Sequence, residues 1–171
     1  MNLSDATFAQ WLQTRNLPGL RIGAWLVALL LPTTWAFDWS VLPDHVGLTG
    51  SIRMTVAGFA VFILLAMRGL PRVIERNVDA LSQALTIMVA ACTAVIAFLH
   101  GGYSSQLFVV FLLVFLAASQ LFTWTIPRAI VAFSAIAVIF IGPWVIGWVR
   151  PANTQAAFIS VVLTLLAIVI C

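Results

Sequence analysis

Residues 108–118 read FVVFLLVFLAA, and residues 133–142 read FSAIAVIFIG. Both stretches are apolar on every side and lack the alternation of apolar and polar side chains that marks the strands of a membrane barrel. Each lies within a longer, mostly apolar segment, and about 20 such residues are enough to cross a bilayer as a helix. The two stretches therefore predict an all-α membrane protein.

The composition of the chain leads to the same class. Hydrophobic residues make up 63% of the 171 residues, charged residues make up 8%, and the mean hydropathy is +1.14. Soluble domains contain only about 45–50% apolar residues. A water-soluble globule is therefore excluded, and the chain has no length left for a separate catalytic domain.

Proline, glycine and charged residues divide the apolar sequence into six candidate spans. They cover Leu20–Phe37, Ile52–Met67, Ala80–Leu99, Gln106–Thr125, Ala129–Val149 and Thr154–Cys171. The second span is the shortest because Arg53 and Arg68 border it, although flanking arginines can reach toward the interface. We expect a polytopic membrane protein with a six-transmembrane-helix bundle at residues 19–171.

Residues 1–18 form a segment of a different character. Ser4 can cap a short helix that carries Phe8 and Trp11 on neighbouring turns, and Pro18-Gly19 is a typical helix breaker. We predict a short N-terminal interfacial amphipathic helix. The start of the chain lacks the basic residues and cleavage site of a signal peptide, so we expect this helix to be retained.

The charges indicate how the bundle is oriented. All eight basic residues are arginines, scattered at helix ends, which favours membrane orientation over a nucleic-acid patch. Six of them share one side of the predicted bundle: Arg15, Arg21, Arg68, Arg72, Arg76 and Arg128. We therefore expect a multi-pass protein of the bacterial inner (plasma) membrane with both termini cytoplasmic. The connection Arg68–Asp79 then reads as a solvated, salt-bridged turn that touches anionic lipid.

The last span stays apolar to Cys171 and has no polar or aromatic anchor at that end. A terminal transmembrane helix usually carries such an anchor. We expect the chain to continue into a cytoplasmic domain, although a short protein that ends in a buried helix has the same pattern.

Polar and aromatic residues gather at the predicted outer ends of the helices. Asp38 and Arg53 can pair across the first hairpin, or they can be separate interfacial charges. Trp35 and Trp39 flank Asp38 and are candidates for lining a pocket. The candidate ligand-binding residues are Trp35, Asp38, Trp39, Arg53, His100, Tyr103, Ser104, Ser105, Gln106 and Trp144.

Residues 100–106, HGGYSSQ, form the most distinctive segment. Two adjacent glycines allow the backbone to approach a ligand closely, and the following side chains supply hydrogen-bonding groups and an aromatic face. An ordinary hairpin turn with Ser104 or Ser105 as a helix cap explains the same residues. A kink at Pro143, beside Trp144, can open space at the same depth.

Besides a protein that binds a ligand in such a pocket, two function classes remain open. His45 and His100 are the two histidines and both lie on the predicted outer side, so a b-type haem with two imidazole ligands is an alternative to a site without cofactor or metal. The chain would then be a haem- or quinone-binding electron-transfer protein. A small transporter is the third class, and the absence of carboxylates and lysines inside the spans counts against ion coupling. No nucleophile has a base partner at a motif spacing, so we expect no enzyme activity of this segment.

The layout resembles the six-helix membrane sensor domains of bacterial histidine kinases and some nucleotide cyclases, including the hydroxyketone quorum-sensing kinases. The residues that carry the resemblance are Gly19-Leu20-Arg21, Asp38 followed by Pro43, Arg53, and Gly101-Gly102-Tyr103-Ser104-Ser105. Many of these domains continue with Pro-Tyr, whereas this chain continues with Gln106-Leu107-Phe108, a departure that bears on the ligand more than on the fold.

The resemblance implies a sensory domain in a two-component or adenylate cyclase signalling protein. It would bind a small apolar or amphiphilic signal in the bilayer and transmit a shift of the sixth helix to a kinase or cyclase domain. A homodimer is expected by the same analogy. Small-residue faces at Ala90-Ala91, Ala94 and Ala117-Ala118 would allow close helix contact between two chains, or equally within one.

Overall fold

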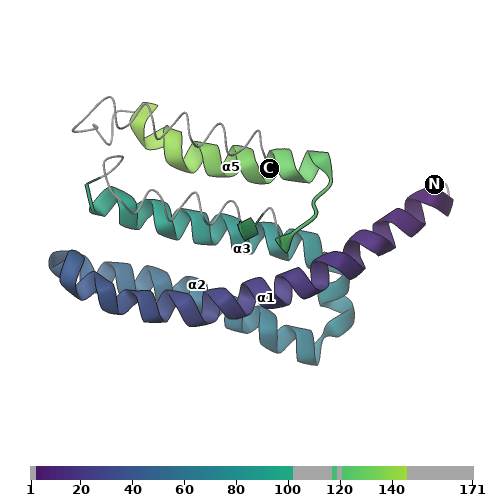
Figure 1. Cartoon of the computed structure of the whole chain (residues 1–171), viewed down its shortest axis with the longest axis horizontal. Coiled ribbons are helices and arrows are strands. Elements are labelled where there is room, and N and C mark those ends of the chain that lie inside the picture. The colour runs from purple at the N-terminus through teal and green to yellow at the C-terminus, as the bar shows by residue number, and fades with distance from the viewer. Residues whose placement is uncertain (1–2, 102–116, 119–120, 146–171) are drawn as a thin grey trace.

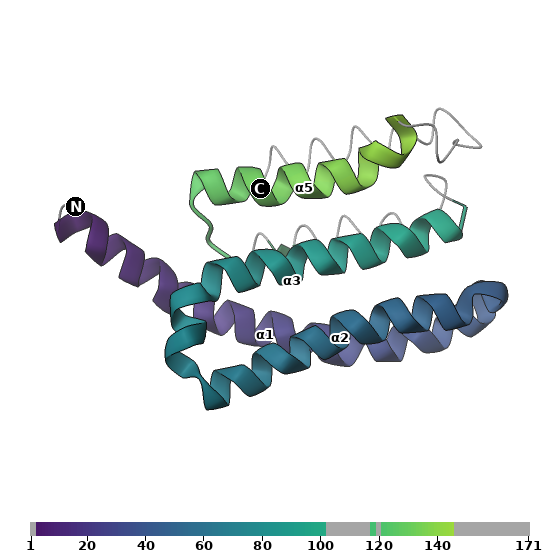
Figure 2. The same ribbon diagram turned by 180° about the vertical axis from the view of Figure 1, so that it is seen from behind.

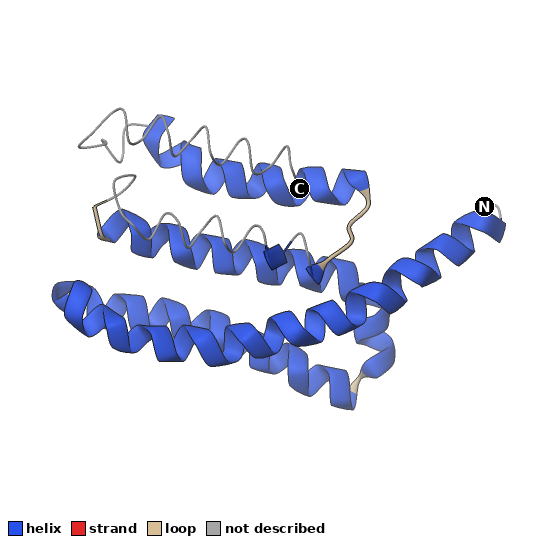
Figure 3. Cartoon of the chain, viewed as in Figure 1, coloured by secondary structure: helices blue, strands red, loops and turns tan. Residues whose placement is uncertain are grey.

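The computed structural model describes residues 3–101, 117–118 and 121–145. This part of the chain is helical (Figures 1 and 3), and the structure shows no strand in it. The elements are α1 (Leu3–Val41), η1 (Pro43–His45), α2 (Val46–Gly69), α3 (Pro71–Leu99) and α5 (Ile126–Val145). The predicted spans Gln106–Thr125, in its larger part, and Thr154–Cys171 lie outside the described residues.

Four of the described helical segments are long and apolar enough to cross a membrane. They are Thr14–Val41, Pro43–Gly69, Pro71–Leu99 and Ile126–Pro143. They coincide with the first, second, third and fifth predicted spans, which confirms the all-α class and is consistent with a membrane protein. Their outward faces carry exposed apolar side chains such as Leu29, Phe62, Leu65, Ile130 and Val138, as expected for helices that contact lipid.

The predicted break at Pro18-Gly19 is wrong. Helix α1 continues from Leu3 through both Pro18 and Pro32 to Val41, and its N-terminal part projects beyond the bundle (Figures 1 and 2). A proline inside a helix removes one backbone hydrogen bond and kinks the helix without necessarily ending it. The contacts of Asn16 and Gly19 with residues 121–123 hold α1 on both sides of Pro18.

Helix α2 is longer than predicted, because Arg53 does not border it. The helix begins at Val46, so Arg53 lies about 10 Å inside it at 1.5 Å per residue. The charge is tolerated at this depth because it pairs with Asp38 of α1.

Helices α1, α2 and α3 pack against one another, and α3 also packs against α5. The first core includes Leu20 of α1, Ile63 of α2 and Leu85 of α3. A second, smaller core joins α3 to α5: it consists of Ala90, Ala94, Ile136 and Phe140. Ala90 and Ala94 are therefore buried within one chain, and of the two arrangements that the sequence allowed for them the structure shows internal packing.

The connections from α1 to α2 and from α2 to α3 are short (Figure 3). Leu70 alone separates α2 from α3, and its backbone N–H donates to the Ala66 carbonyl. Residues 71–79, predicted as part of a solvated turn, instead form the first turns of α3. The α1–α2 turn and the C-terminal end of α3 lie at the same end of the bundle (Figures 1 and 2), and the α2–α3 connection lies at the opposite end.

Candidate functional site

Asp38 and Arg53 form a bidentate ion pair between α1 and α2. Arg53 Nε donates to Asp38 Oδ2 and Arg53 Nη2 donates to Asp38 Oδ1, each at 2.9 Å. Asp38 is 4% exposed and Arg53 is 9% exposed. Fork-to-fork geometry of this kind is the strongest form of a carboxylate–guanidinium contact. Of the two arrangements that the sequence allowed, pairing across the first hairpin and separate interfacial charges, the structure shows the pairing.

Thr34 connects the ion pair to the backbone of α1. Arg53 Nη1 donates to Thr34 Oγ1 at 2.7 Å, and Thr34 Oγ1 donates in turn to the Leu30 carbonyl at 2.8 Å. A guanidinium carries five N–H hydrogens. The described residues accept three of them: two go to Asp38 and one goes to Thr34. Two N–H hydrogens are left for another acceptor.

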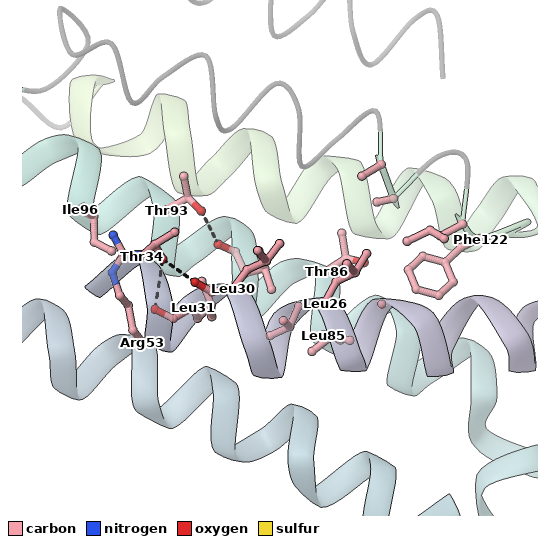
Figure 4. A pocket seen from close by; sticks show the side chains of 16 residues that line it. Leu26, Leu30, Leu31, Thr34, Arg53, Leu85, Thr86, Thr93, Ile96 and Phe122 are labelled. Carbon is pink, nitrogen blue, oxygen red and sulfur yellow. Dashed lines mark hydrogen bonds between the residues drawn. The ribbon is translucent and has the colours of Figure 1, made fainter. Parts of the chain in front are cut away.

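A cavity of about 300 Å³ lies beside Arg53, between α1, α3 and residues 117–118 and 121–122 (Figure 4). Arg53 and Thr34 lie at one end of it and Phe122 at the other. Its wall is mostly apolar and consists of Gly23, Leu26, Val27, Leu30, Leu31, Thr34, Arg53, Leu85, Thr86, Val89, Thr93, Ile96, Ala117, Ala118, Leu121 and Phe122.

The polar groups of this wall are few and have a defined chemistry. Thr86 Oγ1 donates to the Ser82 carbonyl and Thr93 Oγ1 donates to the Val89 carbonyl. Their hydroxyl protons are thus used within α3, and their oxygens present acceptor lone pairs. Among the described residues of the wall, Arg53 is the charged one, and its guanidinium supplies the N–H donors that these residues leave unused.

Trp35 and Trp39 do not line this cavity. Trp35 Nε1 donates to the Val46 carbonyl at 3.1 Å, and its ring covers Gly50 so closely that a Cβ there would lie 2.5 Å from the indole. Trp39 is 65% exposed, with its ring centroid 6.4 Å from that of Trp35. Trp35 therefore fastens α1 to α2, and Trp39 belongs to the surface of the same hairpin.

The remaining predicted site residues are not brought into the cavity wall by the described structure. His100 is the half-buried C-cap of α3, and its backbone N–H donates to the Ile96 and Ala97 carbonyls. Trp144 lies in the last turn of α5, but its side chain is outside the described part. Tyr103, Ser104, Ser105 and Gln106 also lie outside the described residues.

The histidines of the haem alternative are placed only in part. His45 is exposed in η1, within the α1–α2 turn, and His100 follows α3 at the same end of the bundle (Figure 1). A shared end of the bundle does not make them ligands of one iron, so the haem reading stays a prediction.

A second polar cluster lies at the opposite end of the bundle and was missed by sequence reasoning. We call it the Asn16 cluster; it consists of Asn16, Asp79, Thr123 and Arg128. Asn16 Nδ2 donates to Asp79 Oδ1 at 2.7 Å and to the Thr123 carbonyl at 2.9 Å, and Asn16 Oδ1 accepts from the Thr123 N–H at 2.8 Å. Arg128 forms an ion pair with the other oxygen of Asp79.

Further contacts hold residues 121–125 against α1 and α3 at this end. Trp124 Nε1 donates to Ser82 Oγ at 2.9 Å, and the Trp124 ring stacks on Phe122. Gly19 faces the Leu121 carbonyl so closely that a Cβ would lie 2.1 Å from its oxygen. The Pro18-Gly19 pair thus serves close packing, which is why glycine is found there without ending the helix.

The two polar clusters are separated by an apolar stretch of membrane dimensions. Asn16 and Asp38 belong to the same helix, and their Cα atoms are about 33 Å apart along it at 1.5 Å per residue. The hydrocarbon core of a bilayer is about 30 Å thick. This spacing fits one cluster at each boundary of the membrane.

Comparison with known proteins gives no relative: no family model, no curated protein and no solved structure matches the chain.

Proposed function

We propose that this chain is a membrane-embedded sensory input domain that binds a small amphiphilic molecule in the cavity beside Arg53. The observation that carries the proposal is the Arg53 guanidinium, buried at one end of an apolar cavity with two N–H hydrogens left unused by the described residues. Buried donors without an acceptor are unfavourable, so a ligand oxygen at this place gains the full value of the hydrogen bond.

The cavity favours one class of ligand. Its volume of about 300 Å³ is at the small end of the range for ligand sites. Leu26, Val27, Leu85 and Val89 provide an apolar wall for a hydrocarbon chain, and Arg53 provides donors for one polar head. A medium-chain molecule with a carbonyl or similar acceptor at one end satisfies both.

The same contacts suggest how binding changes the protein. Arg53 belongs to α2 and holds Asp38 and Thr34 of α1, so a ligand oxygen that shares its hydrogen bonds alters the packing of α1 on α2. A differential affinity of about 1–3 kcal/mol for one of two helix packings is enough for a regulatory response. By the resemblance stated above, the change would pass through a later helix to a cytoplasmic kinase or cyclase domain.

The test compares a medium-chain methyl ketone with the straight-chain alkane of equal length. In detergent micelles, we expect the ketone to raise the Tm of the wild-type chain and the alkane to raise it less. Val89→Phe fills the cavity and should abolish the ketone effect, whereas Val95→Phe is a matched control on the exposed side of α3 and should retain it.

Two outcomes would overturn the proposal. Equal shifts by ketone and alkane would show that Arg53 does not bind a polar head. A ketone shift that survives Val89→Phe in a protein of unchanged helical content would show that the cavity is not the site.

A further inference from the structure

A second concave region, which we call the arginine groove, lies between α1, α2 and the start of α3. It is separate from the cavity beside Arg53 and has a volume of about 620 Å³. Arg21 of α1, Arg68 of α2 and Glu75 of α3 line it together with Trp25 and other apolar residues. The groove lies at the α2–α3 end of the bundle, where Leu70 connects the two helices.

The charges of the groove are not used inside the described protein. Arg21, Arg68 and Glu75 are exposed, and none of them belongs to the ion pairs that the described residues form. The two arginines and one carboxylate give the groove a net charge of +1 at neutral pH. Arg68 also lies in the last turn of α2, beside the negative end of the helix dipole. Guanidinium groups bind phosphates, like carboxylates, through two parallel hydrogen bonds.

The apolar residues of the groove extend from the two arginines toward the middle of the bundle. Trp25 follows Arg21 by one turn of α1. On α2, Leu65 and Val61 precede Arg68 by about one and two turns. Because α1 and α2 are antiparallel (Figures 1 and 2), both sequences lead from the charged end of the groove toward the middle of the bundle. Trp25, Leu65 and Val61 are all between two fifths and two thirds exposed, so the wall is open toward the lipid.

We propose that the arginine groove binds one anionic phospholipid. Arg21 and Arg68 hold its phosphate, and one acyl chain lies along Trp25, Leu65 and Val61. Charge complementarity and the direction of the apolar wall select this occupant: a soluble anion would use the arginines but not the wall, and an uncharged lipid would use the wall but not the arginines. The proposal does not depend on the ligand of the cavity beside Arg53.

The experiment measures lipid retention and thermal stability of the purified chain. The lipids are phosphatidylglycerol and phosphatidylcholine, added in detergent, with glycerol phosphate at equal concentration as the soluble arm. We expect one phosphatidylglycerol to stay bound in native mass spectrometry and to raise the Tm, with smaller effects of phosphatidylcholine and none of glycerol phosphate.

The double variant Arg21→Gln/Arg68→Gln should lose at least tenfold in phosphatidylglycerol affinity. Arg72→Gln/Arg76→Gln is the matched control, because it removes the same charge from exposed positions of α3 that do not line the groove, and it should retain the wild-type affinity. Circular dichroism checks that both variants keep their helical content.

Three results would overturn the proposal. An equal loss in the control variant would show diffuse attraction of lipid by the basic surface. Because phosphatidylcholine carries the same phosphate but no net charge, its equal binding would show that the groove does not select an anionic lipid. An equal Tm shift by glycerol phosphate would show an anion site without lipid selectivity. If the double variant loses its fold, the phosphatidylglycerol affinity of the single variants Arg21→Gln and Arg68→Gln is measured in the same assay. Wild-type affinity in both would overturn the proposal.

Discussion

Asp38 and Arg53 show how one residue pair can place charge inside an apolar helix bundle. A buried ion that loses its partner is left with its full desolvation cost, whereas replacement of both partners by apolar residues is often nearly neutral. The Asp38 and Arg53 side chains are 6% and 11% exposed, so the pair belongs to the buried class. Its contribution is therefore measured better by the difference between single and double variants than by either single variant.

We predict that Asp38→Leu and Arg53→Leu each lower the free energy of unfolding by about 3 kcal/mol. The double variant Asp38→Leu/Arg53→Leu should be less destabilised than the sum of the two, because it leaves no charge without a partner. Unfolding in mixed detergent micelles measures all three. If the two single effects are simply additive, the ion pair does not couple α1 to α2.

Two glycines of α2 give a matched test of how Trp35 fastens the first hairpin. A Cβ at Gly50 would lie 2.5 Å from the Trp35 indole, whereas nothing lies within 4 Å of a Cβ at Gly58. We predict that Gly50→Ala destabilises the protein by about 1–3 kcal/mol through overpacking. Gly58→Ala should be neutral or stabilising by up to about 1 kcal/mol, because alanine is the better helix former.

The same unfolding assay measures both glycine variants. A loss of stability in Gly58→Ala equal to that in Gly50→Ala would mean that the cost lies in the helix backbone and not in the contact with Trp35.

At the scale of elements, the Asn16 cluster holds the segment before α5 against α1. Asn16 is fully buried, and its amide group satisfies both the N–H and the carbonyl of Thr123. Backbone groups outside a helix need such partners when they are buried. One side chain of α1 thus replaces the hydrogen bonds that residues 122–125 would otherwise make with a regular element.

We predict that Asn16→Ala accelerates amide hydrogen exchange at Thr123 and lowers the free energy of unfolding by about 2 kcal/mol. Asn77→Ala is the control, because Asn77 is exposed and its side chain donates to the Val73 carbonyl of its own helix, its one hydrogen bond to the described residues. An unchanged exchange rate at Thr123 in Asn16→Ala would show that Asn16 does not hold this segment.

The four described helices of membrane length were predictable because apolar length is a local property of the sequence. Their ends were not, because they depend on contacts between distant residues. The sequence predicts Arg53 as the border of a span, whereas its pairing with Asp38 of α1 allows it to lie within α2. The sequence predicts a break at Pro18-Gly19, whereas the contacts of Leu121 and Thr123 hold α1 on both sides of Pro18.

The candidate site was predictable only where its residues lie in one hairpin. Asp38 and Arg53 lie on the two helices of one hairpin, so the predicted topology allowed their pairing as one of two alternatives. The cavity is formed by residues such as Leu30, Val89 and Ala118, which are apolar like their neighbours and carry no signal of their own. Trp35 was expected to line a pocket, and its packing on Gly50 depends on the register of α1 against α2.

At the scale of the whole molecule, the position of the charges relates the bundle to the membrane. Six of the eight arginines belong to the side of the α2–α3 connection in the predicted topology, and the cytoplasmic loops of membrane proteins carry an excess of such residues. Helix α2 is about 36 Å long at 1.5 Å per residue and can cross the bilayer alone. Cysteines placed before α2, in its middle and after it therefore test whether α2 crosses the membrane and which of its ends faces the cytoplasm.

We predict that a membrane-impermeant maleimide labels His45→Cys in intact cells and labels Arg72→Cys only after permeabilisation. The background is Cys92→Ala/Cys171→Ala, and Gly58→Cys, exposed in the middle of α2, should stay unlabelled in both conditions because it faces lipid. Labelling of Arg72→Cys alone in intact cells would reverse the orientation, whereas labelling of His45→Cys and Arg72→Cys from the same side would show that α2 does not span the membrane. The arginine groove lies at the Arg68 end of α2. If Arg72→Cys is labelled only after permeabilisation, the lipid bound in the groove belongs to the cytoplasmic leaflet. Phosphatidylglycerol must then be present in that leaflet to bind.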